Sequence, residues 1–185
     1  MTERLEHALG WNEDDWSDFE IRLVIEAEHI VDKKHPRGHW VGGPFSWKRA
    51  RQVVQFQGHA SLGLTSEAKA WAKSASSQLH EQWQRVFRDP IPKCIKLNAA
   101  IVSYHPTRRF TDASNLYQGP EDVLQVCQPK CKPNCRKHAG VIEDDSAIES
   151  HDGSARAYDK QRPRVEIILT PATRVGVNVQ QEMKL

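Results

Sequence analysis

Two polar motifs, separated by about thirty positions, carry the side chains best suited to catalysis. The first contains Asp112, and the second contains the adjacent pair Asp144 and Asp145. Carboxylate oxygens are hard ligands that suit Mg²⁺ or Mn²⁺. If the three carboxylates meet in one site, the metal they hold would acidify a bound water and neutralise charge on a phosphate. The alternative is two solvated polar turns with no shared role.

The surroundings of these carboxylates favour a phosphodiester substrate. Arg108 and Arg109 precede Asp112, and guanidinium groups bind phosphate oxygens through paired hydrogen bonds. Asn115 follows Asp112 by three positions, so both would face the same side of one turn, and the amide would orient a metal-bound water or the carboxylate. Two carboxylates also suit glycoside hydrolysis, but the neighbouring basic residues favour phosphate over sugar.

A cluster of cysteines between the two motifs has the composition of a zinc site. Cys127, Cys131, Cys135 and His138 lie within twelve positions, and three thiolates with one imidazole suit tetrahedral zinc. The alternatives are a reduced loop and an oxidised cysteine pair. The lysines and arginine of this segment, including Lys137, would form a basic surface for DNA backbone contact. Cys94 stands apart before a strand and is expected to be a buried thiol.

Composition limits the class of protein. The chain has 185 residues with a net charge of +2 and 38% hydrophobic residues, which indicates one domain of ordinary globular composition. No apolar run approaches the length of a membrane span, and the N-terminus lacks the apolar core of a signal peptide. We therefore expect a soluble, cytoplasmic protein (the host cytoplasm if a phage encodes it) without membrane contact, whose cysteines are thiols or metal ligands.

Hydrophobic periodicity predicts an α+β fold, a small mixed β-sheet with two main helices packed on it and an inserted cysteine-rich loop. The clearest helix spans residues 65–87, and the second begins near Pro120. The predicted strands are residues 19–27, 95–104 and 165–170, with a short strand at 52–56 and an irregular or edge strand at 148–158. Residues 1–18 read as an acidic appendage, 19–171 as the folded domain with its insert at 127–138, and 172–185 as a tail.

A long basic region, residues 29–58, has a poor hydrophobic pattern and is expected to be mostly loop. It contains Lys48, Arg49 and Arg51 together with tryptophans. Basic and aromatic side chains suit contact with DNA backbone and unstacked bases. The alternative is a loop whose tryptophans only anchor it to the core.

The motif pair resembles the RusA family of Holliday junction resolvases. The matching residues are Arg108-Arg109, Asp112-x-x-Asn115-Leu116 and the run Ala139 to Asp145, which reads Ala-Gly-Val-Ile-Glu-Asp-Asp. The resemblance spans residues 19–171 in element order, and residues 108–145 at the level of motifs. It implies a homodimeric, Mg²⁺-dependent endodeoxyribonuclease that introduces paired nicks in four-way DNA junctions.

The resemblance also implies roles for individual residues. The metal-binding aspartates of the family fall on Asp112 and Asp145, with Asp144 adjacent. Two positions depart from the family pattern: Ser114 stands where an acidic residue is common, and Gln118 stands where a catalytic lysine is expected. These departures keep a second hypothesis open, a catalytically weak or inactive branched-DNA-binding protein of the same fold. A third is a zinc-stabilised interaction module.

Overall fold

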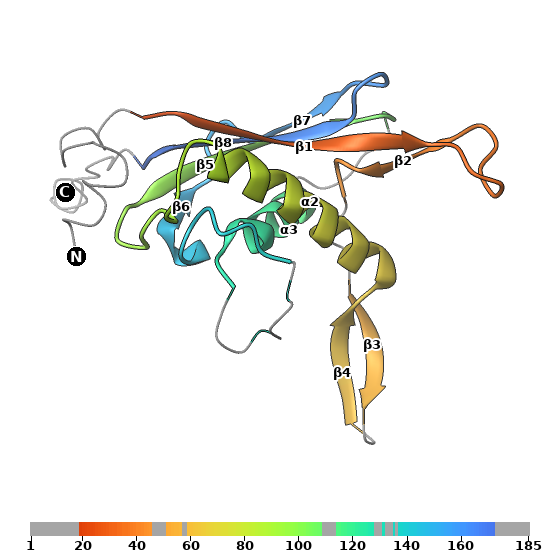
Figure 1. Cartoon of the computed structure of the whole chain (residues 1–185), viewed down its shortest axis with the longest axis horizontal. Coiled ribbons are helices and arrows are strands. Elements are labelled where there is room, and N and C mark those ends of the chain that lie inside the picture. The colour runs from red at the N-terminus through yellow and green to blue at the C-terminus, as the bar shows by residue number, and fades with distance from the viewer. Residues whose placement is uncertain are drawn as a thin grey trace, which may run out of the picture.

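A six-stranded mixed sheet with two helices below one face organises the chain (Figure 1). The computed structural model describes residues 19–45, 51–56, 59–108, 114–127, 131, 135 and 137–172, with only the backbone at 51–56, 59–63, 114 and 115. The predicted appendage at 1–18 and all but the first residue of the predicted tail lie outside these ranges. The expected α+β class with a mixed sheet and two helices is confirmed.

Three long antiparallel strands form the centre of the sheet. They are β1 (Ile21–Ile30), β8 (Arg164–Pro171) and β5 (Leu97–His105), with β8 between the other two. Burial alternates along β1 and β8, as expected for strands with one covered face. The covered face carries buried apolar side chains from all three strands: Ile21, Leu23, Ile25, Leu97, Ala99, Ile101, Val165, Ile167 and Leu169.

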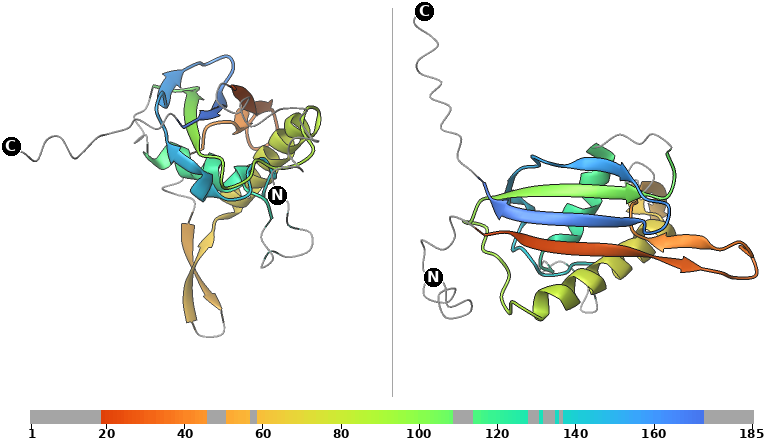
Figure 2. Two further views of the ribbon diagram at one scale, coloured as in Figure 1. Left: turned by 90° about the vertical axis from the view of Figure 1, so that its left-hand side faces the viewer. Right: turned by 90° about the horizontal axis from the view of Figure 1, so that it is seen from above.

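The region predicted as one irregular strand is two short strands. Both β6 (Ile148–Ser150) and β7 (Ala155–Tyr158) pair in parallel with β5, β6 with its start and β7 with its end. The turn between them contains Gly153 at φ 86°, a backbone conformation that glycine adopts without strain. Residues 148–158 therefore run along almost the whole length of β5 (Figure 2).

The expectation of a long loop over residues 29–58 is wrong in part. Strand β2 (His39–Gly42) folds back onto the end of β1, and β3 (Arg51–Phe56) forms a hairpin with β4 (His59–Leu64). The predicted strand at 52–56 corresponds to β3. The β3–β4 hairpin projects away from the sheet beside the start of the first helix, which explains why it lacks the apolar alternation of a core strand (Figure 1).

Helix α2 (Ser66–Gln84) packs a long apolar stripe under the sheet. Thr65 caps its N-terminus by accepting a hydrogen bond from the backbone N–H of Ala68 at 3.2 Å. Its buried stripe includes Trp71, Leu79 and Trp83, and full burial of each such side chain contributes about 2 to 3 kcal/mol before other costs. The regular helix ends before Phe87, whose ring stacks on Trp83 at 4.2 Å between centroids.

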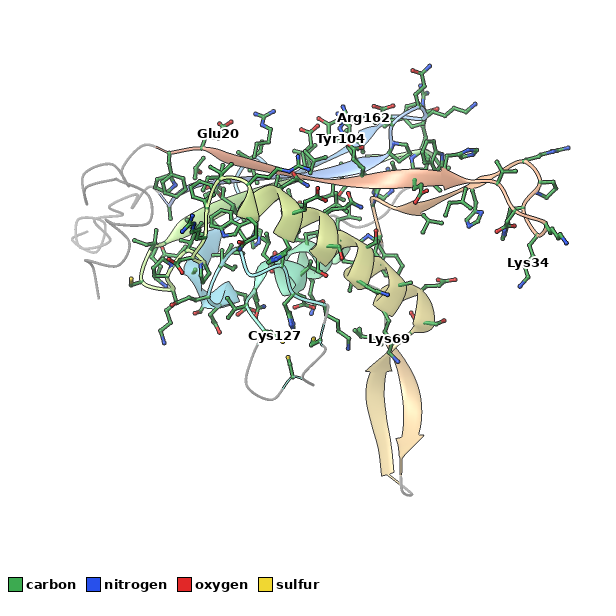
Figure 3. All side chains as sticks on the ribbon, in the orientation of Figure 1. Glu20, Lys34, Lys69, Tyr104, Cys127 and Arg162 are labelled. Carbon is green, nitrogen blue, oxygen red and sulfur yellow. The ribbon has the colours of Figure 1, made fainter. Side chains whose placement is uncertain are left out.

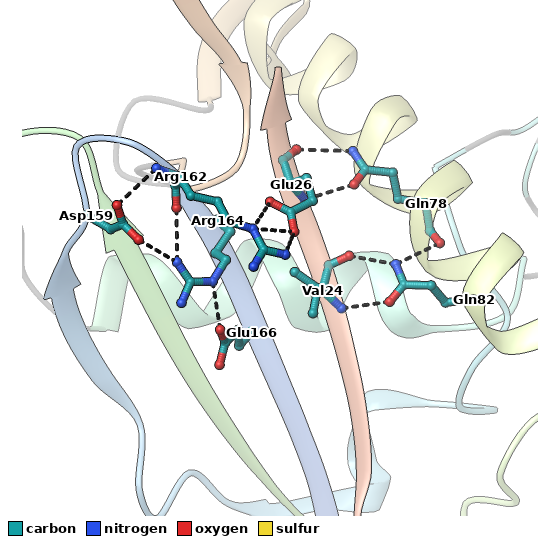
Figure 4. Close-up of polar contacts among 8 residues, drawn as sticks. All are labelled: Val24, Glu26, Gln78, Gln82, Asp159, Arg162, Arg164 and Glu166. Carbon is teal, nitrogen blue, oxygen red and sulfur yellow. Dashed lines mark hydrogen bonds and ion pairs between the residues drawn. The ribbon is translucent and has the colours of Figure 1, made fainter. Parts of the chain in front are cut away.

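Two glutamines of α2 cover the outer edge of β1 (Figure 4). The side-chain amide of Gln82 accepts from the backbone N–H of Val24 at 2.9 Å and donates to its carbonyl at 2.6 Å. Gln78 does the same at Glu26, at 2.8 and 3.2 Å. The two side chains occupy the hydrogen-bonding groups that a further strand would use, which protects this edge from pairing with another chain.

Helix α3 (Ser114–Leu124) begins earlier than predicted and contains Pro120 in its interior. Proline removes one helical hydrogen bond. Because Leu116, Val123 and Leu124 are all at most 2% exposed, packing against the core outweighs that loss. In the part of the chain that is described, no helix is long and apolar enough to cross a membrane.

Candidate functional site

The cysteine cluster predicted from the sequence comes together in space. One potential ligand atom from each of Cys127, Cys131, Cys135 and His138 lies within 4.8 Å of all the others. The Nδ1 atom of His138 is 3.9 Å from the Sγ of Cys131 and 3.7 Å from the Sγ of Cys135. Zinc bond lengths of about 2.3 Å to sulfur and 2.0 Å to nitrogen place tetrahedral ligands about 3.6 to 3.8 Å apart. The group can therefore bind a metal such as zinc with little adjustment.

The backbone on both sides of this Cys₃His cluster is fixed by a ladder of hydrogen bonds. The N–H groups of Ala139 and Val141 donate to the carbonyls of Val123 and Leu124 at 2.7 and 2.8 Å. The N–H of Gly140 donates to the carbonyl of Gln125 at 3.0 Å. The two ends of the insert thus lie side by side next to the core, and Cys127 lies on the loop below α3 (Figure 3).

The cluster also tunes the protonation of its own ligands. Hydrogen bonding with Cys131, followed by burial, raises the pKa of the Cys127 thiol to about 12. Burial raises the pKa of Cys135, but the backbone N–H of Lys137 and hydrogen bonds from the other two thiols outweigh it and lower that pKa overall. Burial and the charge of Lys137 lower the pKa of His138, so its imidazole is neutral at pH 7, the form that binds metal.

The acidic pair lies on a short 3₁₀ turn, η3 (Asp145–Ala147), just before β6. Asp144 caps this turn by accepting from the backbone N–H of Ser146 at 3.0 Å. Hydrogen bonds from the hydroxyl and the N–H of Ser146 lower the pKa of Asp144, so the carboxylate is charged. Its neighbour Glu143 accepts from the backbone N–H of Lys93 at 3.0 Å. Asp144 and Glu143 thus shape the turn, and Asp145 is exposed on it.

Arg108 and Asp145 do not converge in this chain, contrary to the expectation of a single basic and acidic site. Arg108 follows β5, and its guanidinium carbon lies 5.0 Å from the centre of the Tyr158 ring, at the end of β7. Asp145 precedes Ile148, which pairs with Leu97 at the start of β5. The nine residues of β5 span about 26 Å, because each of the eight steps between them advances about 3.3 Å. This length is far more than one phosphate covers.

Several predicted site residues are placed only in part. Asn115 lies in the first turn of α3, and α3 as a whole contacts η3. Arg51 begins β3, and only the backbone of both residues is described. Lys137 is exposed beside the Cys₃His cluster. Asp112, Arg109, Lys48 and Arg49 lie outside the described residues. Cys94, expected to be buried, is exposed in the turn before β5, so its sulfur contributes nothing to the core.

A histidine and glutamate pair next to η3 was not anticipated from the sequence. The Nε2 atom of His151 contacts a carboxylate oxygen of Glu121 at 2.5 Å, and the side chains are 34% and 21% exposed. The His151 ring stacks on Tyr117 with centroids 5.4 Å apart. The partners are thirty positions apart in the sequence, and no local motif signals their contact.

Comparison with protein-family models and with curated proteins finds no match to this chain.

Proposed function

We propose that the chain is a Mg²⁺-dependent, structure-selective endodeoxyribonuclease that resolves four-way junctions and other branched DNA by hydrolysing paired phosphodiester bonds. The observation that carries the proposal is the contact between the two motif-bearing elements. Helix α3, with Asn115 in its first turn, contacts η3, whose first residue is Asp145. The Asp-x-x-Asn half of the motif therefore leads into α3, and α3 contacts η3, which carries the second aspartate of the Asp-Asp half.

The donor chemistry fits a hard divalent cation. Asp145 is an exposed carboxylate on a turn held in shape by Asp144, and Asp112 would complete the set. Mg²⁺ bound there would supply charge neutralisation on the phosphate and a more acidic water. Asp144 orients the turn through one oxygen, which accepts from Ser146, and its other oxygen would add a further ligand beside Asp145.

The Cys₃His cluster is proposed as a structural zinc site in this nuclease. A tetrahedron with four protein ligands leaves no position for water, which is typical of structural rather than catalytic zinc. Zinc would fold the insert against α3 and bring Lys137 to the protein surface, where it would contact a phosphate. Resolution of a junction needs two nicks, so we also propose that two copies act together as a homodimer.

Cleavage of a labelled four-way junction in the presence of Mg²⁺ tests the enzyme proposal. Wild type should produce paired, symmetric nicks, and Asp145→Asn should abolish them. Glu149→Gln is a matched control, because Glu149 is a nearby exposed acid whose closest cation, Lys96, is 3.9 Å away. Equal cleavage by Asp145→Asn and wild type would rule out the metal role of Asp145.

A second candidate is a branched-DNA-binding protein of the same fold without catalytic activity. The distance between Arg108 and Asp145 favours it, as does Gln118, which is exposed on α3 at the position of the expected lysine. This candidate predicts tight junction binding, no cutting with Mg²⁺ or Mn²⁺, and unchanged binding in Asp145→Asn.

A further inference from the structure

We propose that the hairpin between β1 and β2 holds a second metal site, for a divalent transition metal ion such as Zn²⁺, with Asp32, His35 and His39 as ligands. One carboxylate oxygen and one ring nitrogen from each histidine lie within 4.8 Å of one another. Two imidazoles and a carboxylate are borderline and hard donors, a set that binds Zn²⁺, Co²⁺ or Ni²⁺ rather than Mg²⁺. The site is independent of the proposed nuclease function.

The hairpin backbone holds all three ligands in place. Asp32 follows β1, and its Oδ1 accepts from the backbone N–H groups of Lys34 and His35 at 2.8 and 2.7 Å. The N–H of Gly38 donates to the carbonyl of His35 at 2.8 Å, which closes the next turn. His39 is the first residue of β2 and pairs with Ile30, the last residue of β1. Tight turns and strand pairing thus bring the three positions together before any metal binds.

The distances between donor atoms are close to those a metal requires. The Nδ1 of His35 lies 3.2 Å from the Oδ1 of Asp32. Zinc bonds of about 2.0 to 2.1 Å to nitrogen and oxygen place tetrahedral neighbours about 3.4 Å apart. The rings of His35 and His39 are 4.2 Å apart between centroids, tilted at 44°. Small rotations of the side chains complete a three-ligand site with a position left for water.

An unpartnered nitrogen distinguishes a metal site from a simple hydrogen-bonded turn. A hydrogen bond between Asp32 and His35 explains those two residues but not His39. The Nδ1 of His39 is buried and has no hydrogen-bond partner among the described residues. An unpaired buried nitrogen destabilises the fold, and a metal bound to that nitrogen would remove the penalty.

Gly38 explains why the three ligands can approach so closely. It has φ 74°, and a Cβ built there would lie 2.1 Å from the ring of His29. Only glycine lets the chain turn this tightly into β2.

Lys34 points outward at the hairpin tip, far from the loop that carries Cys127 (Figure 3). The chain would therefore carry two separate metal sites, one rich in sulfur and one made of nitrogen and oxygen ligands.

Metal counting on the full-length chain tests the proposal. The protein is loaded with one equivalent of Zn²⁺ to fill the cysteine cluster, then dialysed against Co²⁺ and analysed for both metals. Wild type should bind a further equivalent of Co²⁺. His35→Ala and His39→Ala should bind it at least about 10-fold more weakly. Lys34→Ala is the control from the same turn and should bind as wild type does. Mg²⁺ should not compete.

A second readout covers the case in which His39→Ala alters the hairpin. The His35 side chain is 52% exposed, so its removal leaves the fold unchanged, and it alone suffices to weaken the site. Nuclear magnetic resonance of the imidazoles should show Co²⁺-induced shifts centred on His35 and His39. Equal Co²⁺ binding by wild type and His35→Ala, or shifts centred on other histidines, would overturn the proposal.

Discussion

Arg108 and Asp145 lie at opposite ends of β5. Arg108 packs over Tyr158 at the end where β5 and β7 finish, and Asp145 stands before β6 at the end where β5 begins. One phosphate cannot be contacted by both side chains of one chain. If both take part in the proposed nuclease function, they contact different phosphates of one junction.

This separation predicts different defects for the two residues. Arg108→Ala should weaken junction binding and reduce the slope of log affinity against log salt by about 1, because one phosphate contact is lost. The rate of cutting at saturating DNA should change little. Asp145→Asn should leave the salt slope unchanged and remove cutting. Filter binding across a salt series separates these outcomes, with Arg88→Ala, at an exposed arginine, as the control. A changed salt slope in Asp145→Asn would contradict the different roles given to Arg108 and Asp145.

Loss of the Cys₃His cluster should remove one bound zinc. Cys131→Ser and Cys135→Ser each delete a ligand that lies within 4 Å of His138, so zinc measured by plasma mass spectrometry should fall by one equivalent per chain. The ladder between residues 123–126 and 139–142 should become less protected from hydrogen exchange. Cys94→Ser is the matched control and should retain all of its zinc. Full zinc retention in Cys135→Ser would exclude this ligand set.

The edge of β1 should depend on Gln82. Gln82→Ala leaves the N–H and the carbonyl of Val24 without their partners, which should lower the free energy of unfolding by about 1 to 3 kcal/mol. Urea unfolding measures the change. Gln84→Ala on the exposed side of the same helix should change stability by less than about 0.5 kcal/mol. The double replacement of Gln78 and Gln82 should also promote self-association through the uncovered edge.

Protonation of His105 should lower the stability of the folded chain in acid. Burial, and secondarily the charge of Arg156, lower the pKa of His105 from 6.5 to about 4 in the folded chain. Between these two pH values the unfolded chain binds more protons than the folded chain. The contribution of His105 to stability is therefore complete above pH 6.5 and declines as the pH falls toward 4. Allowing for solvent screening of this partly buried ring, the loss is about 1 to 2 kcal/mol.

Replacing His105 tests that assignment. His105→Gln cannot titrate, so its free energy of unfolding should decline less than that of wild type between pH 7 and pH 4.5. Denaturant unfolding at several pH values gives both curves. Parallel curves for the two proteins would show that His105 titrates normally.

Residues with local patterns were predictable from the sequence. The apolar alternation of β1 and the stripe through Trp71, Leu79 and Trp83 of α2 each reflect burial of one face, which periodicity reports directly. The Cys₃His cluster was also predictable, since its ligands are close in the chain and unusual in composition.

Contacts between distant positions were not predictable. Glu121 and His151 meet only because α3 lies next to the segment after β6. The start of α3 was missed because Pro120 reads as a helix boundary, although core packing tolerates it. Asp32, His35 and His39 stand among lysines and arginine, and their grouping depends on a β1–β2 pairing that the sequence pattern does not indicate.

The most direct test of the proposed function is the rate of four-way junction cleavage by purified wild type and Asp145→Asn in Mg²⁺. The nuclease account predicts paired nicks by wild type, and a reduction of at least about 100-fold in Asp145→Asn with junction binding retained, since even outer partners of metal ligands contribute 10- to 100-fold. Glu149→Gln should cut at the wild-type rate. Binding without any cutting by wild type in Mg²⁺ or Mn²⁺, or equal cutting by Asp145→Asn, would contradict it.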